Sequence, residues 1–469
     1  MWKAKYKQKI KIVSALLVLS FLCLTGMTLS RIGLTPLNHQ DYTKSRDFSV
    51  VVRKDKALYT QIMGDIYDRN GFPILATDQA VTEAPFSYEK SYSHLLGNPY
   101  FKDYGLISRY YDTLMDAKSK DAVPGKGTSL TLTLDDQLQQ YAYSLTQGSR
   151  AAVVVLKRHS GELLALTSTY EEDFDLGSSP DQAVIKSYNE AYEPIWQPEY
   201  LNSYCPGSCQ KIVTAAMGSE AGLNDFCIDD VGYVDYGNDR LIYNNNQSVY
   251  GDGLDEATAF CVSSNTYFAE MMNEIGIAQV RELSSQMKLN AYYQTDFGEV
   301  HNSFADGWRT RDMNRYRFGL LGIGQESSLS AVGLAMVTQM CIDNEMYVPH
   351  VVRNTCYVDK EGVLCTASVN KEELIGSGML QDSSCRRVRE LMETAAHSSG
   401  YALSGNILGA KSGTAEIALD DTFTNRASLV AYDENYIAVV SRIENGAYGI
   451  SNKYIMESLF DQLSFYGEM

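Results

Sequence analysis

The sequence predicts an α+β fold, an α/β sandwich in which an antiparallel sheet and a block of helices form one large domain. An apolar strand at 151–156 is followed by a turn and a second strand at 162–166. Helices rich in small and apolar residues follow at 208–221, 266–275 and 329–341. The chain closes with strands at 407–417, 427–432 and 436–442 and a helix from about residue 451. A sheet whose first and last strands enclose a helical block is α+β or α/β in class, and of these we predict α+β.

Composition and charge exclude several classes of protein. The 469 residues are 45% hydrophobic and 21% charged, a globular mixture long enough for two or three domains and unlike collagen, coiled coils or disordered chains. The net charge of −18 argues against a nucleic-acid partner held through phosphates. The six histidines are scattered and form no H-E-x-x-H pair, so we expect no histidine-built zinc site and no other metal.

The N-terminal residues have the pattern of a membrane anchor. Residues 1–11 contain five lysines and no acid, and an uncharged run at 12–30 follows. As a helix this run would span about 28 Å, close to the thickness of a bilayer core. The lysines predict a cytoplasmic tail at 1–11, with everything after Arg31 on the extracytoplasmic face of the cytoplasmic membrane. The alternative is a cleaved signal peptide, which would have a shorter apolar region and a clearer cleavage site.

The region after the anchor is expected to form a small mixed pedestal domain at 31–148. An extended stalk at 31–60 precedes a strand, an Asn-Gly turn and a strand within 64–76. A further strand at 129–134 leads into a helix that Asp135 caps and that ends near residue 145. Because a buried hairpin opens a new sheet shortly afterwards, we place the domain boundary near 149 and the large domain at 149–469.

Eight of the nine cysteines follow the predicted anchor. They could form up to four disulfides or remain free thiols, and the pattern of cysteines does not define a connectivity. Cys356 and Cys365 flank a predicted hairpin turn at 359–362. A two-residue loop would set them opposite each other, whereas a type I turn followed by a left-handed Gly362 would shift the register by one. The sequence therefore leaves a bridge between them open.

A candidate nucleophile lies at the start of the first helix of the block. Pro206-Gly207 interrupts the chain there and places Ser208 at the N-terminus of a helix that lacks a polar face. Lys211 is one turn further along the same face, within reach of the serine hydroxyl. Burial lowers the pKa of a lysine, which makes Lys211 a candidate base for activating Ser208. Cys209 points about 100° around the helix from Ser208, so we expect it to be a packing residue.

A second short motif, Ser263-Ser264-Asn265, lies in a turn between two helices. The Ser263 hydroxyl could relay protons, and the Asn265 amide could hold a substrate amide. Taken alone, such a sequence is more often a helix cap.

A third motif, Lys411-Ser412-Gly413-Thr414, lies on a strand. A cation, two hydroxyls and a backbone amide along one edge would suit an acyl donor that carries a carboxylate. We expect Gly413 to let a ligand approach the backbone closely. The alternative is an ordinary strand with a lysine at its edge.

In this order, S-x-x-K, S-x-N and K-S-G-T form the motif set of penicillin-binding proteins and class A β-lactamases. The chain resembles the class B penicillin-binding proteins, which are peptidoglycan D,D-transpeptidases of the penicillin-interacting serine acyltransferase superfamily. The resemblance extends to segments at 64–76, 124–139, 161–165 and 322–325. The chain departs from the family pattern at Met63, 167–175 and 428–431. These departures concern the details of the substrate groove, and the catalytic motifs are intact.

The resemblance implies a role for each motif residue. Ser208 would attack the D-Ala-D-Ala bond of a peptidoglycan stem peptide, Lys211 would accept its proton, and Ser263 with Lys411 would protonate the leaving amine. The donor would be bound by Asn265, Ser412, Gly413 and Thr414. The backbone amides of Ser208 and Thr414 would form the oxyanion hole. No cofactor would be required, and β-lactams would be covalent inhibitors.

The family also implies a polytopic SEDS-type glycosyltransferase as a membrane partner. Three other functions remain open, namely a serine β-lactamase, a D,D-carboxypeptidase that passes the acyl group to water, and a non-catalytic cell-wall scaffold. A class A β-lactamase normally has a deacylating glutamate in an E-x-x-L-N stretch after S-x-N, which this sequence lacks.

Overall fold

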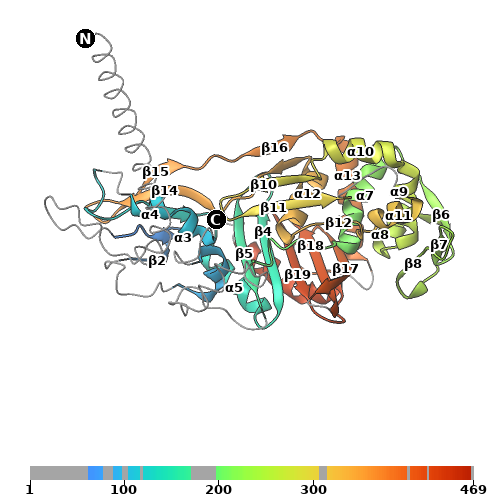
Figure 1. Ribbon diagram of the computed structural model, residues 1–469, viewed down its shortest axis with the longest axis horizontal. Helices are drawn as coiled ribbons and strands as arrows, with labels where there is room; N and C mark the ends of the chain where they lie inside the picture. The colour runs from blue at the N-terminus through green and yellow to red at the C-terminus, as the bar shows by residue number, and fades with distance from the viewer. Residues whose placement is uncertain are drawn as a thin grey trace, which may run out of the picture. The chain divides into compact units, whose positions relative to one another are not determined.

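The antiparallel sheet expected from the two ends of the large domain is present in the computed structural model of the protein. The structure describes residues 62–77, 88–97, 104–116, 120–170, 197–305, 314–398, 402–419 and 422–465. The sheet has the order β17 (Gly409–Leu419), β18 (Thr422–Tyr432), β19 (Tyr436–Ile443), β4 (Arg150–Lys157) and β5 (Leu163–Thr169). All neighbouring strands are antiparallel, and Figure 1 shows the first and last strands of the domain side by side.

Helices cover both faces of this sheet. On one face, Val153 and Val155 of β4 share a buried cluster with Leu459 and Phe460 of α14 (Lys453–Ser464). Helix α5 (Asp136–Thr146) contributes to the same cluster. Helix α12 (Ala331–Asp343) has no residue in this cluster and packs against β4 and β19 on the other face. A strand covered on both faces has no polar side, which explains the continuous apolar run of β4. The α+β prediction is confirmed for the described residues.

The helical block lies between β5 and β17 in the sequence. Its helices are α7 (Lys211–Glu220), α8 (Glu256–Cys261), α9 (Asn265–Ile275), α10 (Ile277–Gln286), α11 (Arg315–Gly322), α12 and α13 (Asp382–His397). Short strands connect them, namely β6 (Cys227–Asp230), β7 (Tyr233–Asp235), β8 (Leu241–Tyr243), β9 (Gly251–Asp255), β10 (Ala291–Gln294), β11 (Glu299–Phe304), β12 (Ser327–Ser328), β13 (Glu345–Tyr347) and β16 (Leu374–Ser377). Helix α13 packs on both β17 and α7, which brings the first and third motifs together.

A second sheet contains the hairpin that the sequence predicts within 64–76. Its order is β15 (Leu364–Val369), β14 (Val352–Val358), β3 (Ser129–Leu132), β1 (Ile66–Tyr67) and β2 (Pro73–Leu75). Short helices α2 (Ser93–Leu96), α3 (Gly105–Arg109) and α4 (Tyr111–Met115) lie between β2 and β3 in the chain. Asp135 caps α5 as expected, because its carboxylate accepts a hydrogen bond from the Leu138 amide.

Two strands of the second sheet come from beyond the expected boundary at 149. Strand β14 pairs with β3 and extends the hairpin sheet with a segment from much later in the chain. The boundary itself stays a prediction. The proposed tail, anchor and stalk, at 1–60, lie outside the described residues. Within the part of the chain that the structure describes, no helix has the length and apolar character needed to cross a bilayer.

The β14–β15 hairpin has the shifted register that a type I turn with a left-handed glycine predicts. Gly362 has a φ of +84°, Tyr357 lies opposite Cys365, and Cys356 lies opposite Thr366. The two cysteines therefore do not face each other. All eight cysteines after the expected anchor are free thiols in the described residues.

Candidate active site

Ser208 lies in a tight turn at the start of a buried helix, as the sequence predicts. A 3-10 turn at Gly207–Gln210 continues directly into α7, and nine of the ten α7 residues from Lys211 onward are buried. Gly207 has a φ of +54°, a left-handed conformation that glycine adopts without steric cost. The turn places the Ser208 side chain in a cavity while the next residue, Cys209, points into the protein.

The Lys211 amine joins the first and second motifs. Its Nζ lies 3.0 Å from the Ser208 Oγ. The same Nζ lies 2.6 Å from the Ser263 carbonyl oxygen, 3.1 Å from the Ser263 Oγ and 2.8 Å from the Asn265 Oδ1. Four oxygens therefore surround one nitrogen, and the structure brings together the serine, the lysine and the S-x-N turn.

The third motif completes the cluster from the opposite side. The Lys411 Nζ donates a hydrogen bond of 3.0 Å to the Ser263 Oγ and one of 2.8 Å to the Ser412 carbonyl oxygen. The Ser263 hydroxyl thus lies between two lysine amines, those of Lys211 and Lys411. This arrangement is suited to moving a proton between the two sides of the site.

Burial controls the charge of both lysines. The pKa of Lys211 lies well below the ordinary value, first because the side chain is fully buried and then because Lys411 is positively charged nearby. Burial lowers the pKa of Lys411 to about 8. A neutral amine has two N–H donors and one lone pair. At Lys211 these donors match the Ser263 carbonyl and the Asn265 Oδ1, which leaves the lone pair for a serine hydroxyl.

The cluster opens into a cavity of about 490 Å³. The predicted residues that line it are Ser208, Ser263, Asn265, Ser412, Gly413 and Thr414. Lys211 and Lys411 lie beneath the surface, with 0% and 4% of their areas exposed. None of the described residues that line the cavity is acidic. An anionic group that enters would therefore meet hydroxyls and amides close to two buried amines.

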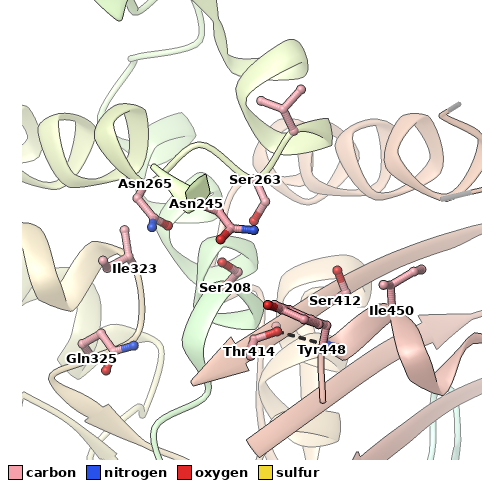
Figure 2. A pocket seen from close by; sticks show the side chains of 13 residues that line it. Ser208, Asn245, Ser263, Asn265, Ile323, Gln325, Ser412, Thr414, Tyr448 and Ile450 are labelled. Carbon is pink, nitrogen blue, oxygen red and sulfur yellow. Dashed lines mark hydrogen bonds between the residues drawn. The ribbon is translucent and has the colours of Figure 1, made fainter. Parts of the chain in front are cut away.

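Several lining residues were not indicated by any motif. They are Asn245, Val262, Ile323, Gln325, Tyr448, Gly449 and Ile450 (Figure 2). Asn245 follows β8 and faces the same space as Ser208 and Ser263. Tyr448 and Gly449 precede α14, and the Gly449 amide donates a hydrogen bond of 3.0 Å to the Thr414 Oγ1. Asn245 lies in a 3-10 turn at Asn245–Gln247, and Gly449 and Ile450 lie in another at Gly449–Asn452. Such short elements have no sequence periodicity, so only Ile323 and Gln325, within the segment at 322–325, had a sequence signal.

Gly413 makes a second close approach that the sequence does not indicate. A Cβ at this position would lie 2.6 Å from the Pro206 carbonyl oxygen, 2.7 Å from the Cys209 amide nitrogen and 2.8 Å from the Cys209 Sγ. The close approach that glycine permits is therefore that of the nucleophile turn against β17. Gly413 also lines the cavity, but what demands a glycine here is the packing between the first and third motifs.

Cys209 is a packing residue, which confirms the sequence prediction. Its side chain is fully buried, and its Sγ lies 3.5 Å from the Lys411 carbonyl oxygen and 3.8 Å from that of Ser428. Burial raises the pKa of the Cys209 thiol to about 11. The thiol is thus held protonated behind the strand that carries the third motif.

Comparison with known proteins supports the family that the motifs indicate. The sequence model described as penicillin binding protein transpeptidase domain matches residues 151–463, more than half of the chain. Two relatives are named peptidoglycan D,D-transpeptidase MrdA. The Acinetobacter baumannii protein is 26% identical over 403 residues, covering 80% of this chain and 59% of the relative. The Escherichia coli protein is 26% identical over 410 residues, covering 76% and 64%. The chain therefore spans about three fifths of the length of these relatives.

Solved structures of penicillin-binding proteins share the fold. Penicillin-binding protein A from M. tuberculosis, as a ceftriaxone acyl-enzyme complex, superimposes with a TM-score of 0.72 and 19% identity, covering 86% of this chain and 98% of that chain. PBP2 from Pseudomonas aeruginosa gives a TM-score of 0.67 and 23% identity, covering 85% and 95%. The family match over residues 151–463 shows that the chain belongs to the penicillin-binding protein transpeptidase family, and with the MrdA relatives and the three assembled motifs it is a member of class B.

Proposed function

We propose that the protein is a peptidoglycan D,D-transpeptidase that acts through an acyl-enzyme on Ser208. The observation that carries the proposal is the buried Lys211 amine, which lies 3.0 Å from the Ser208 Oγ and has a lowered pKa. A serine hydroxyl becomes an effective nucleophile only when a base lies within hydrogen-bond reach. The names of the MrdA relatives and the acyl-enzyme state of the M. tuberculosis structure support the same chemistry.

The acylation step follows from the contacts in the cluster. The Ser208 Oγ attacks the carbonyl carbon between the two D-alanines of a stem peptide, and its proton passes to the Lys211 Nζ. The C–N bond then breaks, and the leaving D-alanine amine takes a proton from the Ser263 hydroxyl. Ser263 is resupplied by the protonated Lys411, whose Nζ lies 3.0 Å from the Ser263 Oγ. An acceptor amine from a neighbouring stem peptide reverses these transfers and closes the cross-link.

Binding of the donor peptide is assigned to the remaining motif residues. The Asn265 amide and the hydroxyls of Ser412 and Thr414 face the cavity, where they would hold the donor amide and its terminal carboxylate. The backbone amides of Ser208 and Thr414 are proposed as the oxyanion hole. Each such donor lowers a reaction barrier by about 3 kcal/mol. The protonated Lys411 beneath the cavity favours an anionic substrate terminus.

The hydrolase alternatives require a base that activates water at the acyl carbon. No described lining residue is acidic, and two nearby glutamates are placed elsewhere. Glu416 is exposed on β17 outside the lining, and Glu270 accepts a hydrogen bond of 2.8 Å from the Tyr236 hydroxyl. A scaffold without activity would not need the two lysine amines buried around one serine hydroxyl. The arrangement therefore favours a long-lived acyl-enzyme over β-lactamase or D,D-carboxypeptidase activity.

The proposal also includes the cellular setting. The lysines at 1–11 and the apolar run at 12–30 support a single-pass anchor in the cytoplasmic membrane, with the pedestal domain at 31–148 and the transpeptidase domain at 149–469 outside. A SEDS-type glycosyltransferase in the membrane is the proposed partner. β-Lactams are the proposed covalent inhibitors, in keeping with the ceftriaxone acyl-enzyme complex of the M. tuberculosis protein.

The test is labelling of the detergent-solubilised full-length protein with fluorescent penicillin. We expect one label, mapped by mass spectrometry to Ser208 and absent from Ser208→Ala. After addition of excess unlabelled penicillin, the label should persist for minutes to hours. A label on another residue would overturn the assignment of Ser208. Release within seconds, with antibiotic turnover, would favour the β-lactamase alternative.

A further inference from the structure

Ser263 has an unusual backbone conformation that the catalytic cluster depends on. Its φ is +57°, a left-handed value that residues with a Cβ rarely adopt. This conformation lets both the carbonyl oxygen and the side-chain Oγ of Ser263 reach the same Lys211 Nζ, at 2.6 Å and 3.1 Å. A strained turn of this kind persists only where the surrounding structure holds it in place.

The side chain that holds this turn is Asn244, which is buried between β8 and α9. Its Oδ1 accepts hydrogen bonds from the amides of Asn265 and Thr266, at 2.8 Å and 3.1 Å, and from the Ser264 hydroxyl at 3.2 Å. The Ser264 Oγ in turn accepts from the Tyr267 amide. Asn244 and Ser264 together therefore accept hydrogen bonds from the first three backbone amides of α9, a helix that begins two residues after Ser263.

Asn244 is itself held by a buried carboxylate. The two oxygens of Asp230 accept hydrogen bonds from the Asn244 Nδ2 at 3.1 Å and 3.0 Å. Asp230 also accepts from the Thr266 hydroxyl at 2.7 Å and from the amides of Gly232 and Tyr250. Asp230, Asn244 and Thr266 are at most 3% exposed. The end of strand β6 is thereby connected through the Asn244 side chain to the turn that carries Ser263.

The position demands an amide side chain. Residue 244 must accept hydrogen bonds from α9 on one side and donate to the Asp230 carboxylate on the other, which only asparagine achieves at this length. An aspartate would accept on both sides and place two carboxylates in contact. The neighbouring Asn245 differs, because it lines the cavity whereas Asn244 does not.

We propose that Asn244, oriented by Asp230, is a positioning residue that fixes Ser263 and Asn265 against Lys211. This inference rests on the proposed acyl-transfer function. Asn244 does not line the cavity and acts only through Ser263 and Asn265, so its loss lowers mainly the rate of the chemical step. Binding of the β-lactam changes less, and only to the extent that the Asn265 side chain is displaced. Small misplacements of catalytic groups have large effects on rate, even when binding is retained.

The experiment measures penicillin acylation of the full-length protein under single-turnover conditions. The dissociation constant of the non-covalent complex and the first-order acylation rate constant are obtained separately, together with the melting temperature. For Asn244→Asp we expect the rate constant to fall about tenfold or more, with the dissociation constant within about threefold of wild type. An acylation rate constant within twofold of wild type would overturn the proposal.

A matched control separates positioning from loss of stability. Asn273 lies on the same helix α9, and its Nδ2 donates to the carbonyl oxygens of Ala269 and Arg315, away from the turn. Asn273→Ala is expected to lower the melting temperature without changing the acylation rate constant. If it slows acylation as much as Asn244→Asp does, the role of Asn244 is merely structural and the proposal fails.

Exchange of the two side chains provides a rescue. The combined variant Asn244→Asp and Asp230→Asn restores one donor and one acceptor across the pair, so it should recover a large part of the lost rate. No recovery would contradict the proposed coupling. If Asn244→Asp does not fold, Thr266→Val decides, because it removes only the hydroxyl that bonds the Asp230 carboxylate at 2.7 Å, the Ser264 Oγ at 2.8 Å and the Asn244 Oδ1 at 3.2 Å. It should slow acylation severalfold with unchanged binding, and an unchanged rate would refute the proposal.

Failure of the proposed function would give a different result. A wild-type protein that penicillin does not acylate, or a Ser208→Ala variant that is still labelled, contradicts acyl transfer on Ser208. Failure of the inference about Asn244 instead requires a wild type that is acylated on Ser208 and an Asn244→Asp variant that is acylated equally fast.

Discussion

The backbone of Gly207 packs directly against the carbonyl group of Thr414. A Cβ added at Gly207 would lie 2.4 Å from the Thr414 oxygen and 2.8 Å from its carbonyl carbon. This contact joins the turn that carries Ser208 to the strand that carries the third motif. It therefore sets the spacing between the nucleophile and the two backbone amides proposed as the oxyanion hole.

We expect Gly207→Ala to abolish penicillin acylation and to destabilise the protein strongly. Two effects destabilise this variant. A residue with a Cβ pays about 1–2 kcal/mol to adopt a left-handed φ, and the new methyl group would clash with the backbone of β17. Gly237→Ala is the matched control, since Gly237 also has a positive φ but nothing within 4 Å of its added Cβ. Urea unfolding and acylation rates are measured for both variants. If both variants lose stability and acylation rate equally, the contact between Gly207 and Thr414 contributes to neither.

The pH dependence of acylation should reflect the two buried lysines. Lys211 must be neutral to accept the Ser208 proton, so the rate rises with pH through the lowered pKa of Lys211. Lys411 must be protonated to resupply Ser263, so the rate falls above its pKa of about 8. Lys411→Arg keeps the positive charge at high pH and should remove the alkaline decline while retaining the acidic one. An alkaline decline that is unchanged in Lys411→Arg would contradict this assignment.

Lys411 should also make stability depend on pH. Its pKa is about 8 in the folded state and near 10.5 when unfolded, so between these values the unfolded chain binds more protons. The free energy of unfolding therefore rises with pH in this window, by up to about 1.4 kcal/mol per pH unit. Below pH 8 the folded protein carries the full cost of burying a charged Lys411. Lys411→Met should lack this contribution. Denaturant unfolding of both proteins between about pH 7.5 and 9.5 measures the difference, and parallel slopes would refute it.

Cys209 should not react with thiol reagents in the native protein. Its side chain is fully buried and its pKa is raised to about 11, whereas Cys227 is exposed and serves as the internal positive control. Alkylation followed by mass spectrometry should modify Cys227 and leave Cys209 intact, with penicillin acylation unchanged. Loss of acylation in wild type but not in Cys209→Ala would mean that the thiol opens into the cavity.

Local sequence patterns were sufficient for the elements that carry the chemistry. The Pro-Gly break before Ser208, the one-turn spacing to Lys211 and the caps at Asp135 and Ser264 are set by residues within four positions of one another. The continuous apolar run at 151–156 predicted the start of the main sheet, because a strand that helices cover on both faces is apolar on both sides. The three motifs and their order then identified the family.

The tertiary structure decided what depends on contacts between distant segments. No sequence pattern indicated that β14 would join the sheet of β1 and β3, because pairing between strands far apart in the chain leaves no local signal. The packing of Gly413 against Pro206 and Cys209 left no signal in the sequence for the same reason, since it depends on a turn about 200 residues earlier in the chain.

The sequence by itself therefore determined which side chains perform the proposed chemistry, since short spacings along a helix or strand set their reach. Only the tertiary structure revealed how Asp230 and Asn244 hold the Ser263 turn. A buried hydrogen-bond network is formed by residues that are adjacent in space and separated in sequence, and its members have ordinary neighbours along the chain. The charge state of Lys211 was likewise decided by folding, because burial and the nearby Lys411 amine exist only once the helical block has closed on β17.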